Sequence, residues 1–96
     1  MELFIFARFH VRAGNEGSAI EAIHEVMGPT RQEAGCLGLN YFQSTRDSQL
    51  FYVHARWQDE AGFNHHATLP HTVRFIQRME ALVDQPLEVT RARLIA

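Results

Sequence analysis

The stretch LFIFARFHV, residues 3–11, predicts the first strand of the fold and the two faces of its sheet. Its residues are aromatic or aliphatic almost throughout, and successive side chains of a strand point to opposite faces. One face would be entirely apolar, formed by Leu3, Ile5, Ala7, Phe9 and Val11. The other face mixes aromatic rings with Arg8 and His10. Such a strand fits a sheet that helices cover on one side only.

Three further strand-like segments follow at residues 36–45, 50–57 and 87–95. The first two flank a polar turn of four residues, which predicts a hairpin. In the third predicted strand the apolar face carries Ala55, which is as small as Ala7 in the first.

Apolar residues at helical spacing predict a helix after Asn15, which Gly28-Pro29 should kink or interrupt. A second helix should begin after Asp59. Pro70 should break it and open a new helical segment, with Thr68 as its cap.

The resulting order is β-α-β-β-α-β, in one domain over residues 1–96. Right-handed crossovers then place both helices on one face of an antiparallel sheet, which is the ferredoxin-like α+β arrangement. In this arrangement the first and third strands are neighbours, so the small side chains of Ala7 and Ala55 would leave room for a ligand.

The sheet face opposite the helices is too apolar to remain in water. Its residues in the first and third strands include Phe4, Phe6, His10, Tyr52 and His54. We therefore expect a homodimer that buries this face, with an interface of obligate size.

Composition excludes several classes of function. All nine basic residues are arginines, which excludes lysine Schiff-base chemistry, and the net charge of −2 without a basic stripe argues against binding nucleic acid. Cys36 is the only cysteine, so neither an intrachain disulfide nor a cysteine-based zinc site is expected. No apolar run approaches the length of a membrane span, and Glu2 directly after Met1 is unlike a secretory signal. These features predict a cytoplasmic protein without membrane contact.

Candidate site residues concentrate around the second helix break. Six histidines are present, and His65, His66 and His71 lie close together in sequence. A helical metal site favours ligands four residues apart, whereas His66 and His71 are five apart across Pro70, so no metal is expected. No glycine-rich phosphate loop is present, which argues against bound nucleotide or flavin.

Three segments carry a family resemblance. The sequences WQDEA at residues 57–61, HATLPH at 66–71 and PTRQEAGC at 29–36 resemble the antibiotic biosynthesis monooxygenase family. The nearest likeness is to its small quinol monooxygenase-like members, and it covers nearly the whole chain. The resemblance implies a dimeric α+β barrel with a pocket between sheet and helices in each subunit. It also implies oxidation of an electron-rich aromatic substrate by O₂ without metal, flavin or any other cofactor.

The resemblance assigns roles to particular residues. A phenol or hydroquinone reduces O₂ once it has lost a proton, so the site needs a base and a dry apolar pocket. The family pattern makes His66 the candidate base and His71 a second candidate. Trp57 would donate its indole N–H to the substrate or stack on its ring. Phe63 and Phe75 would help to line the pocket.

Departures from the family pattern leave alternatives open. Related sequences often carry a glutamate two residues before the tryptophan, where this chain has Ala55, and haem-degrading relatives carry an asparagine that the first strand lacks. The alternatives are a non-catalytic ligand-binding or stress-response dimer, an isomerase or signal-processing enzyme, and haem degradation. The fold alone does not decide between them.

Overall fold

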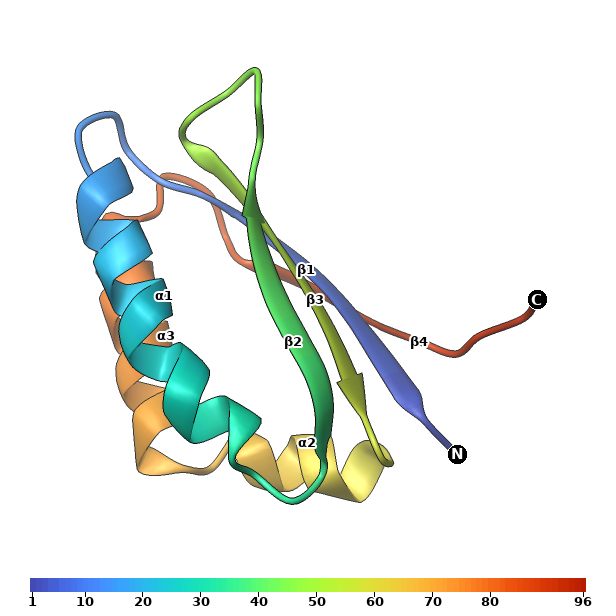
Figure 1. Ribbon diagram of the computed structural model, residues 1–96. Helices are drawn as coiled ribbons and strands as arrows, with labels where there is room; N and C mark the ends of the chain where they lie inside the picture. The colour runs from blue at the N-terminus through green and yellow to red at the C-terminus, as the bar shows by residue number, and fades with distance from the viewer.

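One antiparallel sheet of four strands forms the base of the structure, in the order β2-β3-β1-β4 (Figure 1). The computed structural model describes residues 1–96. Strand β1 (Leu3–His10) lies between β3 (Leu50–Trp57) and β4 (Glu88–Ala92), and β2 (Cys36–Gln43) forms the other edge. The prediction that the first and third strands are neighbours is confirmed.

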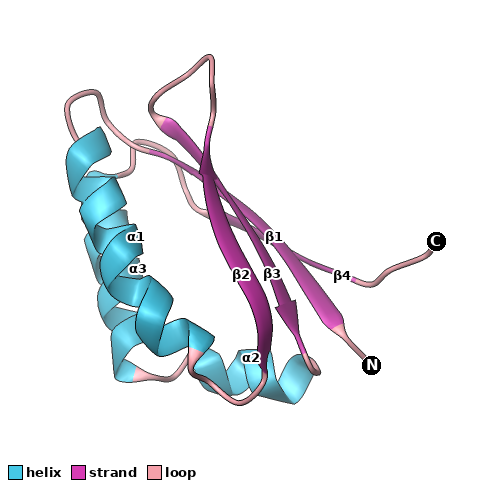
Figure 2. Cartoon of the chain, in the orientation of Figure 1, coloured by secondary structure: helices cyan, strands magenta, loops and turns pink.

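The helices cover one face of this sheet. Helices α1 (Glu16–Arg31) and α3 (Pro70–Leu82) lie against each other on the same side of the sheet, as Figure 2 shows. The short helix α2 (Glu60–His66) crosses the end of the sheet at which β3 stops. The predicted ferredoxin-like α+β arrangement is confirmed. No helix combines the length and apolar character that crossing a bilayer would require.

The core forms two clusters on the helix side of the sheet, because the alternating apolar residues of the strands meet the apolar stripes of α1 and α3. The larger cluster contains Phe9, Val11, Ala19, Ala22, Ile23, Val26, Phe51, Phe75 and Met79. The smaller cluster contains Leu3, Ile5, Leu39, Ala55 and Trp57.

Helix α1 continues through Pro29, so the expected interruption at this position is wrong. Proline removes one backbone donor, but the following turn keeps its bonds because the N–H of Gln32 donates to the carbonyl of Gly28 over 3.2 Å. Thr30 is buried, as is Val26 one turn earlier. Tertiary packing of this face therefore holds the last turn in place.

The helix break between α2 and α3 is correctly predicted, but the N-cap residue of α3 is not. Asp59 caps α2 as expected, since its carboxylate accepts a 2.8 Å bond from a backbone N–H in the first turn. The predicted cap of α3 is wrong: Leu69 holds the N-cap position and Pro70 is the first helical residue. The hydroxyl of Thr68 instead donates to the carbonyl of His65.

Three of the strands are shorter than predicted. Val11 leaves the sheet and forms an isolated bridge with Val83, and the hairpin strand β2 stops at Gln43. The pairing of β4 with β1 ends at Ala92, which leaves Ile95 exposed.

The face of the sheet away from the helices carries exposed aromatic rings. Phe6, Phe42 and Tyr52 are 52%, 53% and 41% exposed. Phe42 pairs directly with Tyr52, so it shares their face, although the sequence did not single it out. Phe6 also contacts the His54 ring, at a centroid distance of 5.0 Å. Aromatic residues gathered in this way are typical of a surface that a second protein covers.

We expect Phe6→Asp to convert a homodimer to monomer, because a carboxylate at the centre of this face would lose its hydration in an interface of above ~2,000 Å². Val73→Asp is the matched control, since Val73 is equally an exposed apolar residue but lies on α3. Light scattering at micromolar concentration measures both. A monomeric wild-type protein would contradict the prediction.

His10, which is expected on this interface, contacts two carboxylates within the same chain. Its Nδ1 lies 2.7 Å from Asp84 Oδ1 and its Nε2 lies 3.1 Å from Asp47 Oδ2. Asp84 precedes β4 and Asp47 lies in the β2–β3 turn, so the protonated ring links three segments. The pKa of His10 is raised above 6.5, mainly because its ring is hydrogen-bonded to the carboxylate of Asp84.

We therefore predict that His10→Gln destabilises the protein most at low pH. A raised pKa in the folded state gives stability that is fully present below about pH 6.5 and is lost as the pH rises through the folded-state pKa. Urea unfolding at several pH values measures the difference from wild type, with His24→Gln on the exposed side of α1 as control. A difference that does not change with pH would refute the link.

Candidate functional site

An apolar cavity of about 190 Å³ lies between the sheet and the helices. It lies where the two core clusters meet, because β1 presents Ala7 there between the larger Ile5 and Phe9. The helix side of its wall comes from all three helices and includes Val26, Phe63, His66, Ala67, Thr72, Phe75 and Ile76. Its walls are therefore mostly apolar, with few polar groups.

Tyr41 is one of these polar groups, and the sequence did not indicate it. It projects from β2 into the cavity wall and packs edge-on against Phe75 at 5.8 Å. Burial raises the pKa of Tyr41, so its hydroxyl stays protonated at neutral pH and is available as a hydrogen-bond donor.

His66 is the titratable side chain that the helices bring to the cavity. It ends α2, and its Nδ1 lies 2.7 Å from Glu33 Oε2 and 3.1 Å from Thr72 Oγ1. The carboxylate is an acceptor, so the bond places a proton on Nδ1. A neutral imidazole protonated on Nδ1 carries its lone pair on Nε2. This tautomer leaves Nε2 able to accept a proton.

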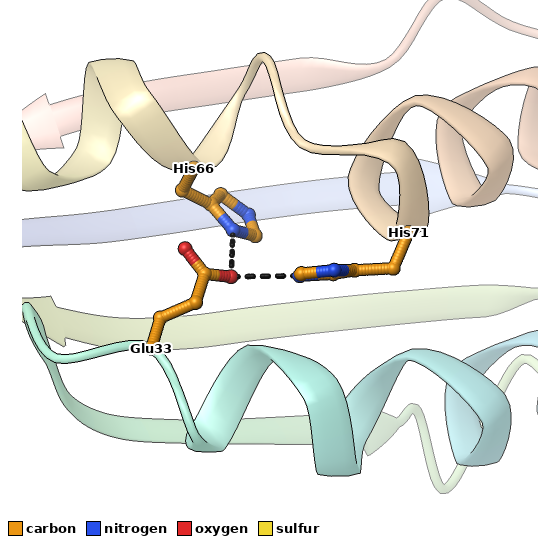
Figure 3. A group of neighbouring side chains, drawn as sticks. All are labelled: Glu33, His66 and His71. Atoms are coloured by element: carbon orange, nitrogen blue, oxygen red, sulfur yellow. Dashed lines mark hydrogen bonds and ion pairs between the residues drawn. The ribbon is translucent and has the colours of Figure 1, made fainter.

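His71 contacts the same carboxylate oxygen from a different direction, as Figure 3 shows. Its Nε2 lies 2.8 Å from Glu33 Oε2. The expectation that spacing across Pro70 keeps the two histidines from converging is wrong. Pro70 restarts the chain as a new helix, so the i,i+4 rule for one continuous helix does not apply. His71 borders the groove between α1 and α3 rather than the cavity.

Glu33 is the central residue of the cluster, and no role was predicted for it. It lies in the turn after α1, within the PTRQEAGC segment that carries the family resemblance. Two glycines bring this turn to α2: a Cβ on Gly35 would lie 3.4 Å from the Cα of Gly62. The turn is also tied to the end of β3, because the N–H of Gln58 donates to the carbonyl of Gly35 over 2.8 Å.

Trp57 lies behind His66 and does not line the cavity. It is fully buried, with its ring centroid 4.7 Å from that of His66 and 5.8 Å from that of Phe63. Its Nε1 has no hydrogen-bond partner. The structure therefore places Trp57 as a support for the His66 ring.

The remaining predicted residues divide into two groups. Ala7, Phe63 and Phe75 line the cavity. Ala55 does not reach it, since it pairs with Ile5 and is enclosed in the smaller core cluster.

The residues of this site fall within a region that matches a known family. The family model for antibiotic biosynthesis monooxygenase matches residues 3–78. The chain belongs to the antibiotic biosynthesis monooxygenase family. The match includes Glu33, His66 and His71, together with most of the cavity wall.

Solved structures share the fold of this family member. PA3566 from Pseudomonas aeruginosa is 28% identical, with 99% of this chain and 95% of that chain covered and a TM-score of 0.90. Rv0793 from Mycobacterium tuberculosis is 20% identical, with 100% and 97% covered and a TM-score of 0.94. An uncharacterised Synechocystis protein, sll1783, is 23% identical over 64% of this chain, and the matched part spans only 42% of that relative's length.

We predict that two replacements of Trp57 lower the free energy of unfolding by different amounts. Trp57→Ala should lower the free energy of unfolding by about 3–5 kcal/mol, as for other large buried side chains. Trp57→Phe should cost clearly less, since it keeps a ring and removes a buried unpaired N–H that itself costs about 1–3 kcal/mol. Urea unfolding at one fixed protein concentration measures both. Equal losses in the two variants would mean that Nε1 has a partner in solution.

Proposed function

We propose that this protein is a cofactor-independent monooxygenase that oxidises a small electron-rich aromatic substrate of the quinol type with O₂. One observation carries the proposal: His66 lies in the wall of an apolar cavity, and Glu33 holds its Nδ1. Membership of the family supports the reaction class.

The cavity favours a compact substrate. Its volume of about 190 Å³ is somewhat larger than that of an engineered apolar cavity of ~150 Å³ that binds benzene. One ring with substituents, or a small fused pair of rings, therefore fits the space better than an extended polycyclic molecule.

His66 would act as the general base. Its Nε2 takes the proton of a phenolic hydroxyl, and the resulting anion gives up electrons to O₂ far more readily than the neutral quinol does. A new bond forms between oxygen and a ring carbon, and the resulting peroxide loses water as its O–O bond breaks. The balance is quinol plus O₂ giving hydroxyquinone plus water, so the substrate supplies all four electrons.

The surroundings suit this role for His66. Glu33 is a positioning residue, because its carboxylate fixes the ring orientation and stabilises the imidazolium that forms. The protonated Tyr41 is a donor available to a developing phenolate. Most of the cavity wall is apolar, which reduces the screening of both interactions by water.

We predict that His66→Ala and His66→Gln lose about 10²–10⁴-fold in turnover, the usual share of one acid–base group. Both variants lose the hydrogen bond of a largely buried ring to Glu33, so they should also lose some stability, and turnover is therefore compared per folded molecule. Oxygen uptake over a panel of hydroquinones and anthrones, with no added cofactor, measures turnover. His65→Gln is the control, since His65 is the exposed neighbour on the same turn of α2.

Two outcomes would contradict the role of His66. If both variants keep more than about a third of wild-type turnover, the expected contribution of a general base is absent. If stability falls while activity per folded molecule is retained, His66 is a packing residue. No oxygen uptake with any substrate in the wild-type protein would favour a binding function of the same cavity.

A further inference from the structure

We propose that Glu33, His66 and His71 form a binding site for one divalent transition-metal ion such as Zn²⁺, and that the bound ion disables His66 as a base. The first part is independent of the proposed function, and the second part rests on it.

The positions of the ligand atoms support the site. Glu33 Oε2, His66 Nδ1 and His71 Nε2 all lie within 4.8 Å of one another (Figure 3). Two ligands of a tetrahedral zinc ion, each about 2.0–2.1 Å from the metal, are about 3.3 Å apart. The two nitrogen–oxygen pairs are 2.7 and 2.8 Å apart, so each must open by only about half an ångström to admit an ion.

The ligand types also suit a transition metal. Two imidazoles with one carboxylate are a common set for zinc and for iron(II), and they leave at least one coordination position open. The carboxylate supplies one negative charge, which favours the binding of a cation over the binding of a neutral ligand.

Packed helices hold the three metal ligands in place, and an ion can reach them from solvent. The three ligands come from the turn after α1, the end of α2 and the start of α3, so packing between helices fixes their spacing. Their side chains are 11%, 15% and 25% exposed for Glu33, His66 and His71. His71 borders the groove between α1 and α3, which gives an ion a route from solvent.

The contacts of His10 differ in geometry from those of the Glu33 cluster. His10 also contacts two carboxylates, but Asp84 and Asp47 bind opposite nitrogens of its ring. Those contacts point away from each other and cannot enclose one ion. In the Glu33 cluster, by contrast, both rings aim one nitrogen at the same point.

Metal binding would reverse the tautomer of His66. A metal on Nδ1 takes the lone pair of that nitrogen, so the ring proton moves through solvent to Nε2. The ring remains neutral, and no proton is released overall. Nε2 then becomes a donor, and the acceptor that the proposed reaction needs is lost. The ion would therefore act as an inhibitor of the oxygenase.

Calorimetric titration of chelator-treated protein with Zn²⁺ tests the binding. We expect one ion per chain, and binding at least about tenfold weaker in Glu33→Gln and in His71→Gln. His65→Gln is the control, because it removes a neighbouring imidazole outside the cluster. Circular dichroism verifies that each variant is folded. In NMR spectra of the wild type, the ring signals of His66 and His71 should shift with Zn²⁺ before those of the exposed His24 and His65.

The outcomes separate the two proposals. No binding tighter than about 100 μM, or equal affinity in Glu33→Gln and His65→Gln, overturns the metal site. Zinc bound at the site with undiminished oxygen uptake overturns the inhibition alone. Absence of oxygen uptake in metal-free wild type overturns the proposed function and leaves the titration result valid.

Discussion

The close approach of two backbone segments around Trp57 determines where the polar residues of the site can meet. Gly35 and Gly62 pass so near each other that a Cβ on either would be in van der Waals contact with the other's Cα, and both flank the indole. The backbone of Trp57 meanwhile pairs with Leu3 in β1 and with Cys36 in β2. The turn that carries Glu33 and the helix that carries His66 are therefore fixed to the same end of the sheet.

The Glu33 carboxylate gains its importance from this placement. Two imidazole N–H groups donate to one of its oxygens, in a setting with little access to water. Hydrogen bonds to a charged group contribute about 1.5–3 kcal/mol each, and a largely buried carboxylate without them would keep its desolvation cost. Glu33 and the two histidines thus stabilise one another, and the same mutual contact orients His66 toward the cavity.

The sequence predicts the layers of this fold well and the site less completely. Alternation in residues 3–11 identifies the buried face of β1 because it depends on local geometry alone. Pro29 misleads because buried Thr30 and Val26 outweigh the loss of one hydrogen bond. The partnership of Glu33 with His66 spans 33 positions, and no local spacing rule encodes it. Pro70 signalled a break, but the direction of the new helix, which turns His71 back toward Glu33, depends on packing against α1.

The cavity and the hydrogen-bonded cluster depend on opposite features of the same packing. Ala7 leaves a space between Ile5 and Phe9, so the walls there lose contacts that a larger residue would make. Beside the cavity, the rings of Trp57, Phe63 and His66 pack against one another, with centroids 4.7–5.8 Å apart. A base is useful only if its ring cannot turn and its free nitrogen faces empty apolar space. In the proposed mechanism, dense packing behind His66 satisfies the first requirement, and the second is served by the cavity that His66 and Ala7 both line.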